Sequence, residues 1–105
     1  MTLQQLKYVV AIDSHHSFAL AAEVLGVTQP TLSGMVGKLE EELGVRLFER
    51  TSRKVTTTTI GVRIARQARQ ILMEADRIRE IVSESRGDIS GPFRLVVGPS
   101  IAPYI

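Results

Sequence analysis

The segment from Ser17 to Lys38, SFALAAEVLGVTQPTLSGMVGK, constrains the fold of this chain more than any other segment. It predicts two short helices joined at Gly26, because Ser17 and Thr28 are favoured N-cap residues and glycine is favoured directly after a helix end. Pro30 is compatible with the first turn of the second helix, where its missing N–H has no intrahelical partner. The pattern predicts a helix-turn-helix, the arrangement that places a helix in the major groove of DNA.

The residues on either side of this pair predict a further helix and a hairpin. Thr2 and Gln5 form a capping-box pattern before apolar residues at helical spacing, so we expect a helix over residues 3–13. The β-prone runs 47–50 and 55–57 flank a polar turn. They indicate a hairpin, which is the wing of a winged helix-turn-helix.

A long helix is expected over residues 59–86, capped by Thr58, stopped by Gly87 and about 40 Å in length. A hinge-like stretch and a single buried strand follow, and one strand cannot fold alone, so we expect a fragment of a longer protein. The predicted fold is mainly α and has three parts. These are a winged helix-turn-helix DNA-binding domain at 1–58, a dimerising linker helix at 59–87, and a hinge with the first strand of a truncated domain at 88–105.

The second helix of the pair is predicted to carry small and polar groups on the face opposite its apolar residues. Gln29 lies at its start, where an amide suits a base edge. Gly34 and Gly37 each cost about 1 kcal/mol against alanine inside a helix, which calls for a reason such as close approach to DNA. The alternative is an ordinary surface helix. The predicted DNA contacts from this helix are Thr28, Gln29, Pro30, Thr31, Ser33, Gly34 and Lys38.

Positive charge is concentrated in the predicted hairpin. The whole chain has a net charge of +2, but segment 46–62 holds four basic residues and one acidic residue. A local excess of this kind is typical of surfaces that bind nucleic acid. We therefore predict that Arg50, Arg53 and Lys54 contact DNA, with a solvated turn as the alternative interpretation.

The long helix carries apolar residues at alternating spacings of four and three, which is the a/d pattern of a coiled coil. This pattern predicts a homodimer, whose two-fold symmetry would match an imperfectly palindromic double-stranded DNA site. Packing against a missing part of the same chain is the alternative. The predicted seam consists of Ile64, Ala68, Ile71, Ala75, Ile78 and Val82.

The sequence contains no cysteine and no pattern of catalytic or metal-ligating residues. We interpret His15 and His16 as a solvated loop pair, because adjacent side chains point apart, and Glu40–Glu42 as the solvated end of a helix. No run approaches the roughly 20 apolar residues that span a membrane, and the N-terminus lacks a signal-peptide pattern. We expect a cytoplasmic protein without enzymatic activity, metal or cofactor.

Three segments together resemble the N-terminal part of LysR-type transcriptional regulators: AAEVLGVTQPTLS at 21–33, KLEEELGVRLFERTSRKV at 38–55, and the start of the linker helix at 58–61. Within that family, TQPTLSG, ERTSRKV and GPFRLVVGPSIAPY are most similar to the OxyR branch of hydrogen-peroxide-sensing activators. The alternatives are a LysR-type regulator that responds to a small-molecule metabolite, and a helical protein-interaction module.

The resemblance implies an effector-binding domain that begins near Phe93, tetramers on promoter DNA, and contact with RNA polymerase. It also implies DNA contacts at Gln29, Pro30, Thr31, Ser33 and Gly34 of the second helix and at Arg53 of the wing. The chain departs from the family at Ala19, Leu20 and Gly37, where relatives often carry basic residues. Phosphate contacts are therefore expected to depend more on the wing.

Overall fold

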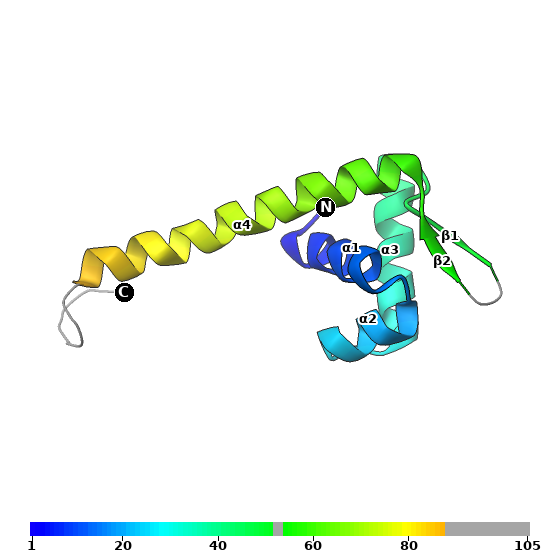
Figure 1. Cartoon of the computed structure of the whole chain (residues 1–105), viewed down its shortest axis with the longest axis horizontal. Helices are drawn as coiled ribbons and strands as arrows, with labels where there is room; N and C mark the ends of the chain where they lie inside the picture. The colour runs from blue at the N-terminus through cyan, green and yellow to red at the C-terminus, as the bar shows by residue number, and fades with distance from the viewer. Residues whose placement is uncertain (52–53, 88–105) are drawn as a thin grey trace. The chain divides into compact units, whose positions relative to one another are not determined.

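The computed structural model describes residues 1–51 and 54–87. In chain order its elements are α1 (Leu3–His15), α2 (Phe18–Leu25), α3 (Gln29–Leu43), β1 (Phe48–Arg50), β2 (Val55–Thr57) and α4 (Thr59–Gly87) (Figure 1). The predicted mainly α, winged helix-turn-helix fold is confirmed. Arg53 of the wing and the hinge and strand predicted at 88–105 lie outside the described residues.

The first helix is capped as the sequence predicts but ends later. The Thr2 side chain accepts a hydrogen bond from the Gln5 N–H at 3.1 Å, and the Gln5 side chain accepts one from the Thr2 N–H at 2.9 Å. The predicted end at residue 13 was wrong by two residues, because α1 continues through His15. His16 ends the helix in the left-handed region, with φ of 53°.

The helix-turn-helix pair follows the predicted caps. Ser17 accepts a hydrogen bond from the Leu20 N–H, and Gly26 ends α2 with φ of 73°. Thr28 caps α3, and Gly44 ends it with φ of 71°. These left-handed positions favour glycine, which has no Cβ to clash with the following carbonyl.

A single core joins the first three helices, the wing and the start of α4. Val9, Ile12, Leu32 and Leu39 are fully buried between the helices, together with Leu47 before β1. Full burial of such side chains contributes about 1.5–3 kcal/mol each, so this cluster provides most of the stabilising free energy. It also fixes which face of α3 remains open to solvent.

The first compact unit, which we call the head, comprises Met1–Leu72 and therefore extends past the predicted boundary at residue 58. Ala65 and Ala68, from the first turns of α4, are buried in it. A Cβ added to Gly61 would lie 2.2 Å from the carbonyl oxygen of Leu47. Only glycine therefore fits at position 61, where α4 passes the backbone of Leu47 just before β1.

Polar contacts also connect α4 and β2 to α1. Asp13 accepts a hydrogen bond from the Thr57 hydroxyl at 2.7 Å, and its carboxylate pairs with the Arg69 guanidinium at 2.9 Å. Arg69 additionally donates to Ser14 at 2.9 Å. The second unit begins at Met73, and its described part is the remainder of α4.

Candidate DNA-binding surface

The N-terminal half of α3 exposes the residues that the sequence predicts as DNA contacts. Leu32, Val36 and Leu39 bury one face of the helix in the core. The opposite side is open to solvent. Ser33 is half-buried, and the other six predicted contacts are exposed: Thr28, Gln29, Pro30, Thr31, Gly34 and Lys38. The helix is therefore divided between packing and a solvent-facing surface.

The start of α3 is organised by two threonines. Thr28 Oγ1 accepts a hydrogen bond from the Thr31 N–H at 3.2 Å and donates one to Thr31 Oγ1 at 2.8 Å. The Thr31 hydroxyl can then donate its own proton to a further acceptor, and the N–H groups of the first turn carry partial positive charge. This helix start is suited to an anionic phosphate oxygen.

Gly34 and Gly37 occupy the exposed side of α3. Among the described residues, no heavy atom lies within 4 Å of a Cβ built at either position. Packing inside the described head therefore does not require glycine there, although each glycine lowers helix stability by about 1 kcal/mol relative to alanine. Close approach of an external surface to the helix backbone gives these glycines a physical reason.

The wing is a two-stranded antiparallel hairpin that follows α3 in the chain and extends from the head near this helix (Figure 1). Its register pairs Phe48 with Thr57 and Arg50 with Val55. The Thr51 N–H donates to the Lys54 carbonyl oxygen at 2.9 Å across the end of the hairpin. Lys54 is exposed, so the described part of the wing carries an exposed cation near the end of the hairpin.

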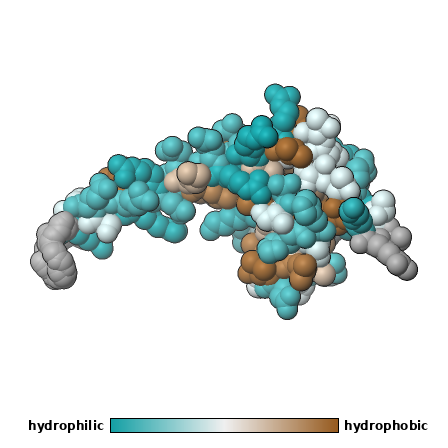
Figure 2. Space-filling model, viewed as in Figure 1, coloured by the Kyte–Doolittle hydropathy of each residue, from teal (hydrophilic) through white to brown (hydrophobic). Residues whose placement is uncertain are grey.

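The surface of α2, by contrast, is apolar. Figure 2 shows hydrophobic side chains gathered over this helix, and Leu20 and Val24 are 50% and 64% exposed. Ala19 and Leu20 thus add no positive charge at the first helix of the motif. Cations for phosphate must come from α3 and the wing.

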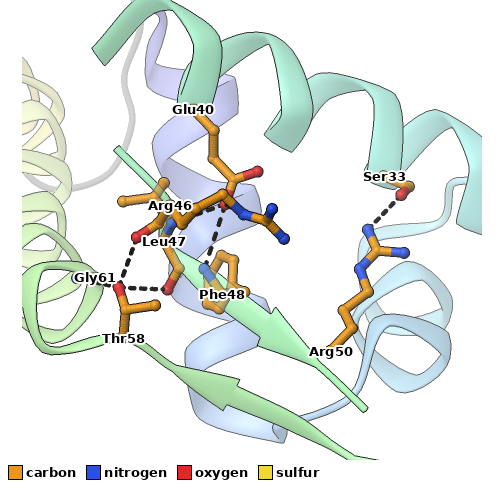
Figure 3. Close-up of polar contacts among 8 residues, drawn as sticks. All are labelled: Ser33, Glu40, Arg46, Leu47, Phe48, Arg50, Thr58 and Gly61. Carbon is orange, nitrogen blue, oxygen red and sulfur yellow. Dashed lines mark hydrogen bonds and ion pairs between the residues drawn. The ribbon is translucent and has the colours of Figure 1, made fainter. Parts of the chain in front are cut away.

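Arg50, which the sequence predicts as a DNA contact, also makes two contacts within the chain. Its guanidinium stacks on the ring of Phe18, 3.7 Å from the ring centroid. It also donates a hydrogen bond to Ser33, which Figure 3 shows. Side chains two residues apart on a strand share a face, so the buried Phe48 places Arg50 on the inner side. That alternation was the available signal in the sequence.

The interpretation of Glu40 as part of a solvated helix end is wrong. One of its carboxylate oxygens accepts hydrogen bonds from the backbone N–H groups of Leu47 at 2.7 Å and Phe48 at 3.3 Å (Figure 3). Arg46 lies 3.8 Å from the same oxygen. Glu40 thereby attaches the start of β1 to α3. The sequence alone did not indicate this contact, which depends on the chain turning back after Gly44.

The residues predicted for the dimer seam fall into two groups. Ala68 is 1% exposed, and Ile64 packs against the core of the head. These two side chains pack within a single chain, so they are not available for the predicted contact with a second copy. The remaining positions are half-buried or exposed: Ile71, Ala75, Ile78 and Val82.

Two negative findings apply to residues 1–51 and 54–87. No group of three or more His, Asp or Glu side chains in that range could hold a metal ion. No helix of the same range has the length and apolar character needed to cross a membrane.

Comparison with known proteins points in the same direction as the geometry. A sequence model of the bacterial regulatory helix-turn-helix proteins of the lysR family matches residues 3–62. Two relatives are each 44% identical over all 105 residues: a hydrogen peroxide-inducible genes activator of Pectobacterium carotovorum subsp. carotovorum and the DNA-binding transcriptional dual regulator OxyR of Escherichia coli K12. This chain covers 35% and 34% of them, respectively. It therefore spans about a third of the length of these curated relatives.

Solved structures share the fold. A full-length OxyR variant from Pseudomonas aeruginosa is 44% identical, with a TM-score of 0.78 over 83% of this chain and 30% of that chain. The BenM DNA-binding domain in complex with catB site 1 DNA is 38% identical, with a TM-score of 0.79 over 84% of this chain and 99% of that one. The match therefore includes nearly the whole of that DNA-binding domain.

Proposed function

Because the chain belongs to the lysR family of bacterial regulatory helix-turn-helix proteins, we propose that it is the DNA-binding part of a peroxide-responsive transcriptional activator. One observation carries the DNA-binding role: the side of α3 away from its buried residues is exposed and has no side chains at Gly34 and Gly37, and the wing with its exposed Lys54 follows this helix. The peroxide response is supported by relatives named as hydrogen peroxide-inducible activators.

In this proposal α3 lies in the major groove. The Gln29 amide bonds a base edge, with adenine as the preferred partner because it offers both a donor and an acceptor. Thr28 and Thr31, with the first N–H groups of α3, bind phosphate. Pro30, Ser33 and Gly34 line the same face, and Lys38 adds a cation beyond them.

The wing supplies the remaining positive charge. Arg53 and Lys54 bind the phosphates of the neighbouring groove or enter the minor groove, as basic arms do. Since phosphate contacts release counterions, affinity falls steeply as salt rises. This sequence-independent attraction supports the sequence-specific contacts of α3.

The whole protein is proposed to act in the cytoplasm as a homodimer through the exposed part of α4, from Ile71 to Val82, and as a tetramer at full length. Two-fold symmetry then presents two copies of α3 to an imperfectly palindromic operator. Contact with RNA polymerase completes the activator role. The effector domain would begin near Phe93.

Gln29 provides the test of sequence reading. Replacing Gln29 with alanine is expected to weaken binding to a duplex selected from a random library by about 1–3 kcal/mol, while binding to an unselected duplex changes little. Fluorescence anisotropy at two salt concentrations measures both. The exposed Glu41→Ala variant is the control. Equal losses on the two duplexes would contradict base contact by Gln29.

Arg53 provides the test of the wing. Arg53→Ala is expected to weaken binding to every sequence and to reduce the magnitude of the salt slope by about 1, because one phosphate contact is lost. The affinity is measured at four or more salt concentrations. A slope that does not change would exclude this residue as a phosphate ligand.

A further inference from the structure

The guanidinium of Arg50 connects three elements of the head. It lies at the end of β1 and stacks 3.7 Å from the centroid of the Phe18 ring of α2. It also donates through Nη2 to Ser33 Oγ of α3, as Figure 3 shows. A residue with these contacts fixes the position of the wing relative to α3. Arg50 is itself exposed, so these contacts orient a guanidinium that solvent can still reach.

The ring beneath Arg50 is itself held in place. Phe18 is 4% exposed and meets Phe48 edge-on, with ring centroids 6.0 Å apart and an interplanar angle of 82°. A planar guanidinium on a fixed aromatic face keeps its donors in a fixed fork. Lysine would lack that fork, because its ammonium is a point charge on a flexible stem.

The direction of the hydrogen bond determines what Ser33 can offer to DNA. Arginine has only donors, so Ser33 Oγ accepts and its own proton remains for another acceptor. Among the described residues, Ser33 Oγ donates no hydrogen bond. Ser33 is four residues after Gln29, so both lie on the same side of α3.

We propose that Arg50 is a positioning residue that holds Ser33 as a hydrogen-bond donor toward an acceptor atom on DNA, and that it is not itself a phosphate ligand. Suitable acceptors are a phosphate oxygen, a purine N7, guanine O6 or thymine O4. This inference rests on the proposed DNA-binding function. It assigns Arg50 a different role from the other basic residues of the wing.

The test is a double-mutant cycle with Arg50→Gln, Ser33→Ala and the double variant, using the unaltered chain and a duplex selected from a random library. Each single variant is expected to lose about threefold to tenfold in affinity, the net effect of one hydrogen bond. The double variant is expected to bind no worse than the weaker single variant, since both remove one interaction. Multiplied losses in the double variant would overturn the proposal.

The salt slope separates positioning from phosphate binding. Arg46→Gln is the matched control, because this exposed arginine lies after the C-terminal end of α3. Arg50→Gln is expected to have the same slope as Arg46→Gln. A slope reduced by about 1 relative to that control would show a direct phosphate contact and overturn the proposal.

Arg50→Lys keeps the inference testable if Arg50→Gln unfolds. Lysine preserves a charge that can bind phosphate as a point charge, so a phosphate ligand would lose less affinity than Ser33→Ala does, whereas the positioning role predicts the same loss as in Ser33→Ala. Ser33→Thr retains the hydroxyl and is expected to recover the affinity lost in Ser33→Ala.

A measurement without DNA tests the geometry itself. In NMR spectra of the free chain, the Phe18 ring is expected to shift the Arg50 side-chain protons, and Ser33→Ala is expected to move the Arg50 guanidinium resonances. Unshifted Arg50 protons would overturn the inference. If the unaltered chain binds no duplex at low salt, the proposed function falls and this inference with it. If it binds and the two residues act independently, only this inference falls.

Discussion

Replacing Gly61 with alanine places a methyl group at the point where α4 passes the wing entrance. The new Cβ would lie 2.2 Å from the Leu47 carbonyl oxygen and 2.9 Å from Cγ2 of Thr57. Ordinary van der Waals contact needs about 3.5 Å, so the backbone must separate by more than about 1 Å. The same Leu47 oxygen accepts a hydrogen bond from the Thr58 N–H at 2.9 Å, which that separation would lengthen.

The magnitude follows from three opposing effects. Overpacking costs about 1–3 kcal/mol, and the weakened Thr58 hydrogen bond costs about 1 kcal/mol. The better helix propensity of alanine returns about 1 kcal/mol. The free energy of unfolding is therefore expected to fall by about 1–3 kcal/mol, and each 1 kcal/mol lowers the Tm by about 4–8 °C for a domain of this size.

Gly37→Ala is the matched control because the chemical change is identical in the same type of element. A Cβ at Gly37 meets no described atom within 4 Å, so only the propensity gain remains and the Tm is expected to rise. Thermal unfolding followed by circular dichroism, at equal chain concentrations, compares the two variants. If Gly61→Ala were as stable as Gly37→Ala, the close approach of α4 to Leu47 would be refuted.

Two further predictions concern Glu40 and the exposed part of α4. Glu40→Ala leaves two partly buried N–H groups without their acceptor and is expected to lower the free energy of unfolding by about 1–3 kcal/mol in chemical denaturation. Its exposed neighbour variant Glu41→Ala should change it by less than about 0.5 kcal/mol, and equal effects would contradict the role of Glu40. Ile78→Asp is expected to raise the dimer dissociation constant at least about tenfold in analytical ultracentrifugation, because a charge would enter an apolar seam. Met73→Asp, on the opposite side of the helix and 70% exposed, is the control, and an equal loss would remove the seam assignment.

The sequence predicts the helix ends well because the signals are local. The capping box of Thr2 and Gln5, the Thr28 cap and the left-handed positions of Gly26 and Gly44 each depend on a few neighbouring residues. Their chemistry is the same in any fold, so it can be recognised from the chain alone. The position of the recognition helix follows from these ends.

Contacts between distant segments were harder to predict. Glu40 binds the backbone seven and eight residues later, and the apolar spacing that includes Ala68 does not distinguish burial in the head from burial against a second copy. Arg50 was predicted to contact DNA from its charge alone, and its contacts with Phe18 and Ser33 join segments that are distant in the sequence. The polar run at 13–16 indicated a break in the helix, so the end of α1 was placed too early; the helix continues to His15, and His16 ends it in the left-handed region.

The burial of Ala65 and Ala68 gives α4 two roles within one continuous element. Its opening turns seal the interior of each protomer, while the later turns are those available for pairing. A chain shortened at residue 58 would leave the apolar floor of the head uncovered and is expected to collapse or aggregate rather than persist as a monomer. The proposed pairing is therefore best altered by single side chains in the later turns, with the first turns of α4 left intact.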